Sequence, residues 1–176
     1  MRIIAGKHKG RVLAETHGNR THPMSEKIRG ALFNSLGDIT GLSVLDAFSG
    51  TGTVAIEAAS RGANYVQAID IDKEAFRCMQ KNVAIIGCDK VVKTTQANTS
   101  SWSDNKTTEK FNIVIADPPH DGVQVKLIKK LSNHVTEGGV LVLCIPVGMS
   151  VELGDSYKEL AEKNYGNAKL VFYRAL

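Results

Sequence analysis

A carboxylate followed by two prolines, in Asp117-Pro118-Pro119-His120, stands directly after the apolar run 111–116. The Asp117 carboxylate and the Pro118 carbonyl can each accept a hydrogen bond from one N–H group of an exocyclic amine on a nucleobase. Two such bonds would tilt the amine nitrogen towards sp³ geometry and direct its lone pair at a methyl donor. The locked φ of proline fixes the geometry of the carbonyl, and the carboxylate offsets the positive charge that develops on the nitrogen. We therefore predict that residues 117–120 are catalytic; the alternative is a proline-stiffened loop.

Glycines two positions apart follow a second apolar run, in the segment from Val44 to Gly52. Glycine is needed where the backbone turns sharply or a ligand comes close, and the first amides of the helix that follows would face the same crevice. The spacing Gly50-x-Gly52-x-x-Ala55 also satisfies the relaxed dinucleotide fingerprint, so a nicotinamide cofactor is an alternative. No Lys or Arg directly follows the glycines, which argues against a phosphate-binding loop.

Two further acids stand where an adenosine-containing cofactor would need them. Asp70 ends another apolar run 20 residues after Gly50, where a carboxylate receives both ribose hydroxyls. The alternative, a surface acid that opens a helix, describes Asp72 better. Asp46 could bind the ammonium of a methionine group, and a sulfonium cofactor has no pyrophosphate to hold. These features favour S-adenosylmethionine.

Two neighbouring residues are candidates for the adenine of that cofactor. Ile71 could pack on the adenine face, because it follows Asp70 directly. Asn98, just past the next strand, could bind the adenine edge, and a loop cap is its equally weighted alternative.

The order of the elements predicts an α/β protein. We expect strands at 43–47, 65–69, 90–95, 111–116 and 140–145, with helices at 53–61, 73–86 and 122–134 between them. Strands 2–5 and 11–14 around a glycine-flanked basic tip predict a hairpin, followed by a helix from the N-cap Ser25 to about Leu36. Residues 157–164 and 170–173 predict a closing hairpin, despite the helix-forming composition of the first. We expect one domain, 1–176, with 1–24 as a basic N-terminal extension.

Composition excludes several classes. An apolar fraction of 43% and a charged fraction of 23% are ordinary for a globular protein. No apolar run approaches the roughly 20 residues of a membrane span, and the first residues lack signal-peptide features. The three cysteines show neither zinc spacing nor a C-x-x-C pair. We therefore expect a cytoplasmic protein with reduced thiols, no disulfide and no metal.

The positive charge is concentrated at the amino terminus. The chain carries a formal net charge of +4, whereas residues 1–30 hold seven basic and two acidic side chains. A basic arm on a near-neutral body suggests a polyanionic partner held through its phosphates. We predict that Lys7, Lys9 and Arg11 contact RNA, and a solvated basic surface is the alternative.

Several segments of the sequence resemble the signature motifs of a known family and occur in the same order. They are Arg2-Ile3-Ile4-Ala5-Gly6 with Gly10-Arg11, the run His22-Pro23-Met24-Ser25-Glu26-Lys27-Ile28-Arg29 continuing to Asn34, Leu45-Asp46-Ala47-Phe48-Ser49-Gly50-Thr51-Gly52, the run from Ile56 to Ala63, and Tyr165-Gly166 with Leu170-Val171-Phe172-Tyr173. On these motifs the chain resembles the bacterial 16S ribosomal RNA guanine-N2 methyltransferases of the RsmD type over nearly its whole length.

The resemblance implies a class I methyltransferase fold, a Rossmann-like seven-stranded and mostly parallel sheet with a small N-terminal hairpin and helix extension. It implies transfer of one methyl group from S-adenosylmethionine to N2 of a guanine in small-subunit rRNA, with Asp117 and Pro118 holding the amine. The expected partner is 16S rRNA or an assembling 30S subunit, and the expected state is a monomer. The resemblance also implies that Phe48, Ser49, Ser25 and Arg29 contact the cofactor, in addition to the cofactor-binding residues named above.

Four residues depart from the family pattern. His120 replaces a Tyr or Phe that would stack on the extruded base, Met24 replaces Thr, Gly30 replaces Glu, and Cys144 falls near an acid of many members. The alternatives are therefore an adenine-N6 or protein glutamine-N5 methyltransferase, and an RNA-binding relative with weakened catalysis. A nicotinamide oxidoreductase would leave Asp117-Pro118-Pro119 unexplained.

Overall fold

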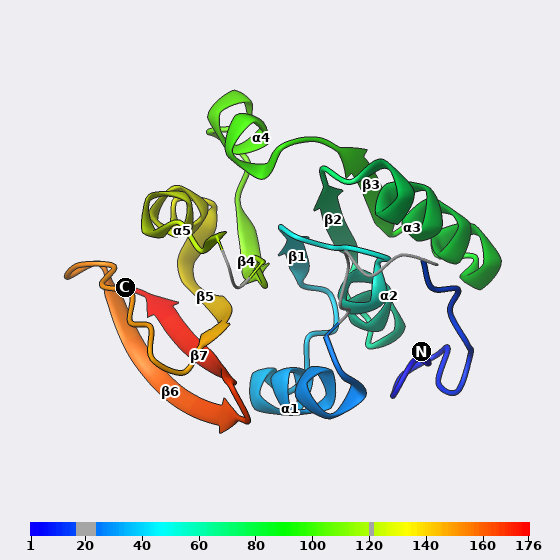
Figure 1. Cartoon of the computed structure of the whole chain (residues 1–176), viewed down its shortest axis with the longest axis horizontal. Helices are drawn as coiled ribbons and strands as arrows, with labels where there is room; N and C mark the ends of the chain where they lie inside the picture. Colours follow the sequence, from blue (N-terminus) through cyan, green and yellow to red (C-terminus); the bar gives the residue numbers. More distant parts are fainter. Residues whose placement is uncertain (17–23, 120–121) are drawn as a thin grey trace.

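The computed structural model describes residues 1–16, 24–119 and 122–176. Over these residues one sheet of seven strands runs in the order β3-β2-β1-β4-β5-β7-β6 (Figure 1). The parallel strands are β1 (Ser43–Asp46), β2 (Tyr65–Asp70), β3 (Val92–Gln96), β4 (Phe111–Ala116) and β5 (Val135–Pro146). β7 (Ala168–Ala175) is antiparallel to both β5 and β6 (Tyr157–Tyr165). This mixed, mostly parallel sheet confirms the predicted fold class.

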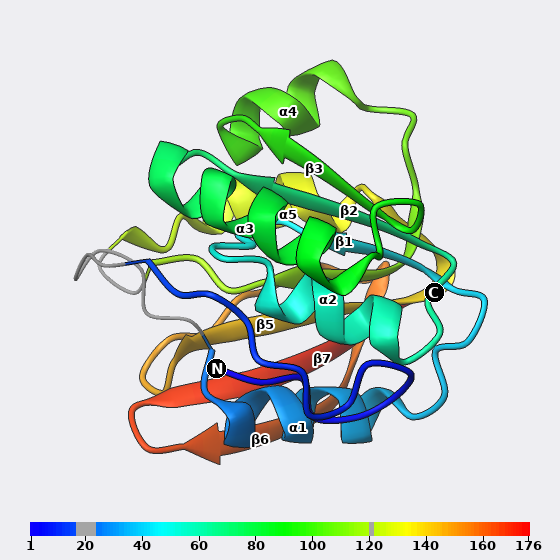
Figure 2. The same cartoon turned by 90° about the vertical axis from the view of Figure 1, so that its right-hand side faces the viewer.

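Helices cover both faces of the sheet (Figures 1 and 2). On one face lie α1 (Glu26–Leu36), α2 (Thr53–Ser60) and α3 (Lys73–Ile86), and on the other lie α4 (Thr99–Asn105) and α5 (Val125–Ser132). Each face has its own apolar core, because successive strand residues point to opposite sides. Val44 belongs to the core under α1, α2 and α3, and its neighbour Leu45 to the core under α4 and α5. Burial on both faces explains the continuous apolar runs.

Most predicted elements are confirmed, including β4 to the residue and the closing hairpin of β6 and β7. Two predictions were wrong in extent. The fifth strand begins at Val135, before the expected 140, and α5 is shorter than the expected 122–134. The N-terminal strands reduce to one antiparallel bridge between Arg2 and Val12.

The helix α4 was not expected, because its Ser- and Asn-rich sequence has low helix propensity. Tertiary packing holds it. Trp102 is buried against the rings of Phe111 and His134, and Asn98 caps the first turn. Trp102 is therefore the packing anchor of α4.

A buried carboxylate attaches the N-terminal extension to α2. The Glu57 side chain has no exposed surface and accepts the backbone N–H groups of Ile4 at 2.7 Å and Ala5 at 3.0 Å. The N–H of Lys7 bonds the carbonyl of Ser60 at 2.8 Å. The hairpin tip therefore lies at the C-terminal end of α2, about 12 Å of helix away from the glycine loop that begins it.

Candidate active site

Three predicted acids lie close together where the parallel strands end, here called the carboxyl edge of the sheet. Asp46 ends β1, Asp70 ends β2 and Asp117 directly follows β4, and β1 lies between the other two strands. In register, Asp46 pairs with Ala68 on one side and Ile115 on the other. Asp70 and Asp117 each lie two residues further along their strands. The topology thus gathers acids that are far apart in the sequence.

The Asp70 carboxylate is fixed by two backbone amides. Its Oδ2 accepts the N–H of Gly50 at 2.7 Å, and its Oδ1 accepts the N–H of Asp72 at 2.8 Å. Burial raises the pKa of Asp70, and the two amide bonds partly oppose that shift. Each carboxylate oxygen keeps a second lone pair for a hydroxyl of a ligand. This geometry suits the predicted ribose contact. Asp72 itself caps α3 through the N–H groups of Glu74 and Ala75, as the sequence suggested.

The glycine loop leaves room beside Asp70. Gly50 has a φ of 55°, and a side chain built there would meet no atom within 4 Å. Gly52 differs, because a Cβ there would lie 2.9 Å from Cγ of Met79, and its φ is 85°. Gly52 is thus required for the close approach of α3, and Gly50 borders open space. The half-buried Phe48 precedes this loop.

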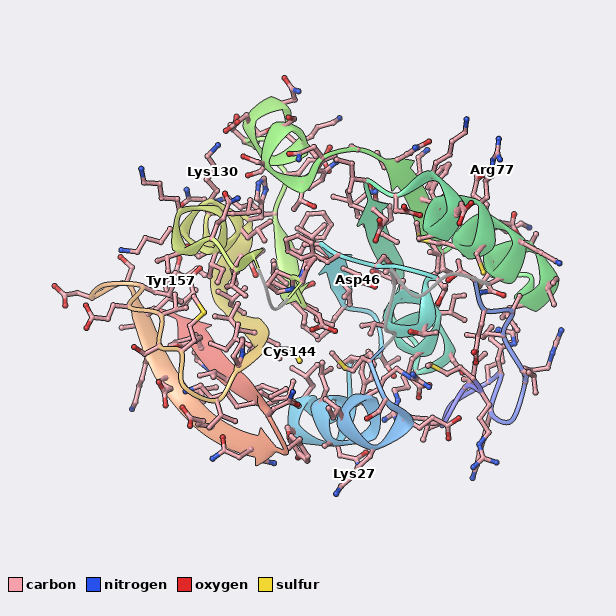
Figure 3. The ribbon with its side chains drawn as sticks, in the orientation of Figure 1. Lys27, Asp46, Arg77, Lys130, Cys144 and Tyr157 are labelled. Carbon is pink, nitrogen blue, oxygen red and sulfur yellow. The ribbon has the colours of Figure 1, made fainter. Side chains whose placement is uncertain are left out.

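Asp46 is almost entirely buried, with 1% of its surface exposed. Ser49 Oγ donates a hydrogen bond to its Oδ2 at 2.6 Å. Burial raises the pKa of Asp46 to about 7, and the charges of Asp117 and Asp70 add to the increase, whereas the Ser49 bond opposes it. A cation bound beside Asp46 would favour its ionised form. Figure 3 shows Asp46 near the centre of the molecule, at the end of its strand.

Asp117 has a neighbour on β5 whose role the sequence did not reveal. Ala116 pairs with Leu143, so Cys144 follows beside Asp117. The Cys144 thiol is buried and interacts with the Asp117 carboxylate beside it. Burial above all, and then the charge of Asp117, raise the pKa of this thiol, so it remains a donor. In the sequence alone, Cys144 is only a departure from the family pattern.

The two prolines after Asp117 differ in their carbonyls. The Pro119 carbonyl accepts the N–H of Gly122 at 3.1 Å. Among the described residues no donor bonds the carbonyl of the buried Pro118, which is the predicted amine acceptor. His120 lies outside the described residues, so its predicted stacking role stays a prediction.

The remaining predicted cofactor residues lie in different settings. Ile71 is 63% exposed beside Asp70, which suits packing on a flat ring. Asn98 is exposed but its Oδ1 already accepts the N–H of Ser101 at 3.1 Å, as its capping alternative required. Ser25 caps α1 by accepting the N–H of Ile28. No ligand contact of these residues is tested, and each stays a prediction.

Arg29 has a structural role that the sequence did not reveal. Its side chain has no exposed surface, and its guanidinium donates to the carbonyls of Met24 at 3.1 Å and Arg2 at 2.6 Å. Its Nε lies 3.7 Å from the Glu57 carboxylate. The enclosed side chain thus joins the extension to α2, and its predicted contact with the cofactor stays a prediction.

The predicted RNA-binding cations lie away from the three acids. Lys7, Lys9 and Arg11 are all exposed on the hairpin, whose tip contacts the far end of α2. Arg11 donates to the carbonyl of Ile85 on α3 at 2.8 Å. An RNA that touched both regions would have to extend along the α2 and α3 side of the molecule.

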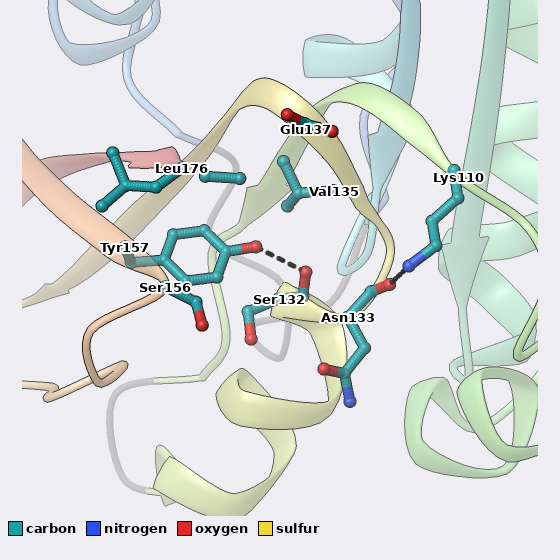
Figure 4. A pocket seen from close by; sticks show the side chains of 9 residues that line it. Lys110, Ser132, Asn133, Val135, Glu137, Ser156, Tyr157 and Leu176 are labelled. Carbon is teal, nitrogen blue, oxygen red and sulfur yellow. Dashed lines mark hydrogen bonds between the residues drawn. The ribbon is translucent and has the colours of Figure 1, made fainter.

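A separate hollow of about 240 Å³ lies at the other end of the parallel strands, where β4 and β5 begin (Figure 4). Across it Tyr157 donates to the carbonyl of Ser132 at 2.7 Å, and Lys110 donates to the carbonyl of Asn133. None of the three acids lines it. In the described part of the chain no group of His, Cys, Asp and Glu could hold a metal ion. None of the described helices has the length and apolar character to cross a bilayer.

Comparison with known proteins shows where this architecture recurs. Residues 1–174 match the family described as conserved hypothetical protein 95. "Ribosomal RNA small subunit methyltransferase D" of Buchnera aphidicola subsp. Acyrthosiphon pisum is 32% identical over 133 residues, which are 74% of this chain and 69% of that protein. "Putative rRNA methyltransferase YlbH" of Bacillus subtilis is 28% identical over 99% of this chain and 98% of its own length. The solved structure "Putative methyltransferase yhhF from Escherichia coli" superposes with a TM-score of 0.89 and 26% identity, covering 99% of this chain and 97% of its own.

Proposed function

The chain belongs to this family, the RsmD-type ribosomal RNA methyltransferases, and we propose that it methylates the N2 amine of a guanine in 16S rRNA. S-adenosylmethionine is its cofactor. When bound, this cofactor supplies an electrophilic methyl group on a positively charged sulfur. The 30S subunit, or an assembly intermediate of it, is the proposed form of the substrate.

The residues at the carboxyl edge fit the cofactor. Open space at Gly50 admits a ligand next to the fixed Asp70 carboxylate, which would hold the ribose hydroxyls. The buried Asp46 lies where a carboxylate would offset the charge of the methionine ammonium. Among the described residues from β1 to α2 no Lys or Arg is present to hold a pyrophosphate. These carboxylates, without a basic side chain beside them, therefore suit a positively charged cofactor better than a dinucleotide with its pyrophosphate.

The observation that carries the proposal is the position of Asp117-Pro118 at the same edge. Asp117 follows β4, the strand that neighbours β1, so its carboxylate faces the space that Asp46 and Asp70 border. Asp117 and the Pro118 carbonyl, which accepts no hydrogen bond from the described residues, would hold the two N–H groups of the guanine amine. The carboxylate offsets the charge that develops on nitrogen and accepts the proton that the amine loses. Positioning supplies much of the remaining rate.

Transfer of tritium from labelled S-adenosylmethionine to unmethylated 30S subunits and to naked 16S rRNA tests this function. The product would be digested to nucleosides and separated. We expect the label in N2-methylguanosine. Label in N6-methyladenosine, or in protein, would retain the amino-methyltransferase chemistry and reject the guanine assignment. Cofactor binding without any transfer would reject the function and support a binding-only relative.

A further inference from the structure

The outward face of α3 carries a row of cations. Lys73, Arg77 and Lys81 are each four residues apart and all exposed, so they follow one another about 6 Å apart along the helix axis. The opposite face of α3 is buried in the core through Ala75, Met79, Val83 and Ile86. Figure 3 shows Arg77 on α3 pointing away from the sheet. Lys73, Arg77 and Lys81 are here called the α3 cation row.

This row does not stabilise the helix that carries it. Like charges four residues apart repel by a few tenths of a kcal/mol. Lys73 is the first residue of α3, where the helix dipole disfavours a cation. Within the described residues none of the three has a carboxylate within 4.0 Å, whereas Lys130 and Lys106 on the other face are paired with Asp104 and Glu109. In the described residues the charges of the row are thus not neutralised by ion pairs.

The row continues into the hairpin. The chain around Ala14 lies on α3, because its N–H bonds Asn82 at 2.8 Å and its carbonyl accepts from Cys78. Arg11 reaches the carbonyl of Ile85, one turn beyond Lys81. Lys9 and Lys7 follow towards the tip. The nearby acid Glu15 is neutralised by the amino group of Met1.

At its other end the row begins beside the candidate active site. Lys73 directly follows Asp72, whose N–H bonds the Asp70 carboxylate. From there the 14 residues of α3 span about 20 Å towards the hairpin. A strand that enters the site could therefore keep its backbone on an unbroken line of cations.

We propose that the α3 cation row is a docking surface for the phosphate backbone of the RNA substrate, continuous with the cations of the hairpin. The inference rests on the proposed function. Exposed and unpaired cations in a line attract a polyanion, because bound phosphates release their condensed counterions. The row links the predicted hairpin contacts to the acids at the sheet edge, which otherwise lie at opposite ends of α2.

A charge-matched pair of triple variants tests this surface. The first is Lys73→Gln, Arg77→Gln and Lys81→Gln. The control is Lys126→Gln, Lys129→Gln and Lys158→Gln, which removes three exposed cations from α5 and β6 that have no carboxylate partner in the described structure. Glutamine is a good helix former, so the fold of the first variant should persist. Thermal melts check it.

Affinity for 16S rRNA would be measured over a series of salt concentrations. The slope of log affinity against log salt should fall by about 2 in the α3 variant, because each phosphate contact contributes about 0.7 to 0.9. The KM for rRNA should rise at least about tenfold at low salt, with cofactor affinity unchanged. The control should keep the wild-type slope.

Two results would overturn the proposal. Equal losses in both variants would mean that net charge alone matters, and a wild-type slope in the α3 variant would place the RNA elsewhere. The proposed function fails separately, if the wild-type protein transfers no methyl group to rRNA. If the wild-type protein and the α3 variant both transferred methyl groups normally, with equal KM for rRNA, the α3 docking surface alone would be rejected.

Discussion

The thiol of Cys144 on β5 lies beside the carboxylate of Asp117, the first residue after β4, and the two groups interact. The thiol is buried, and the carboxylate is the group proposed to hold the guanine amine. A hydrogen bond from this thiol would orient the carboxylate and stabilise its charge. Cys144 would therefore position Asp117 without touching the substrate.

Cys144→Ala should lower kcat about tenfold, because a hydrogen bond to a charged group contributes about 1.5 to 3 kcal/mol and part of the loss is recovered by relaxation. Cofactor affinity should not change. Cys144→Ser, which retains a donor, should recover most of the rate. Equal rates for the alanine and serine variants would show that the thiol only fills space.

Asp46→Asn should change the pH dependence of stability. The pKa of Asp46 is raised to about 7 in the folded protein, against about 4 in an unfolded chain. The folded state therefore holds this proton more tightly, and the stability it contributes below about pH 4 is lost as the pH rises towards 7. Asparagine removes the titration.

The variant should thus gain free energy of unfolding over the wild type with rising pH, by up to about 4 kcal/mol at pH 8. Urea unfolding of both proteins at about pH 5 and about pH 8 measures the larger part of this change, about 2 to 3 kcal/mol, because Asp46 in the unfolded chain is already mostly ionised at pH 5. The same difference at both pH values would contradict the burial of an ionisable Asp46. Cofactor affinity should fall in the variant, since the carboxylate is lost.

Asp70→Asn should weaken S-adenosylmethionine binding about 10- to 100-fold, because one acceptor oxygen becomes a donor and the charge is lost. That donor would also face the N–H of Gly50 or Asp72, which Asp70 now accepts. Asp72→Asn is the matched control. It removes a charge two residues away, and asparagine caps a helix as well as aspartate does. Calorimetric titration that gave the same affinity for both variants would reject the ribose assignment.

Gly6→Ala should detach the hairpin tip, whereas Gly10→Ala should not. Both glycines have positive φ, of 82° and 84°, so both substitutions strain the backbone similarly. Only at Gly6 would the new Cβ collide with backbone, at 1.8 Å from the carbonyl oxygen of Ser60. We expect Gly6→Ala to lose about 2 kcal/mol or more beyond Gly10→Ala in urea unfolding. Similar losses in the two variants would mean that the tip is not docked on α2.

Structural features that a single local sequence pattern specifies could be predicted from the sequence. Five of the six residues from Phe111 to Ala116 are apolar because both faces of β4 are covered, and the bounds of this strand were predicted to the residue. The 20-residue interval from Gly50 to Asp70 placed both at one edge, because parallel strands end together. β6 was found through the turn signal at Gly166, although its own composition favours helix.

Features that depend on partners distant in the sequence could not be predicted. Arg29 looked like a cofactor residue, and only the fold brings the buried Glu57 and the carbonyl of Arg2 to it. The Cys144 thiol meets Asp117 through strand pairing that no local pattern encodes. α4 has weak helix propensity, and the packing of Trp102 decides its structure.

The most direct test of the account is the single-turnover rate of methyl transfer to 16S rRNA by Asp117→Ala, with Asp104→Ala as a control that removes an exposed acid paired only with Lys130 among the described residues. We expect a fall of at least about 100-fold for Asp117→Ala, since both the amine acceptor and the base are lost, with cofactor affinity retained. Asp104→Ala should react as the wild type. A wild-type rate in Asp117→Ala would contradict the assignment of this carboxylate to the reacting amine.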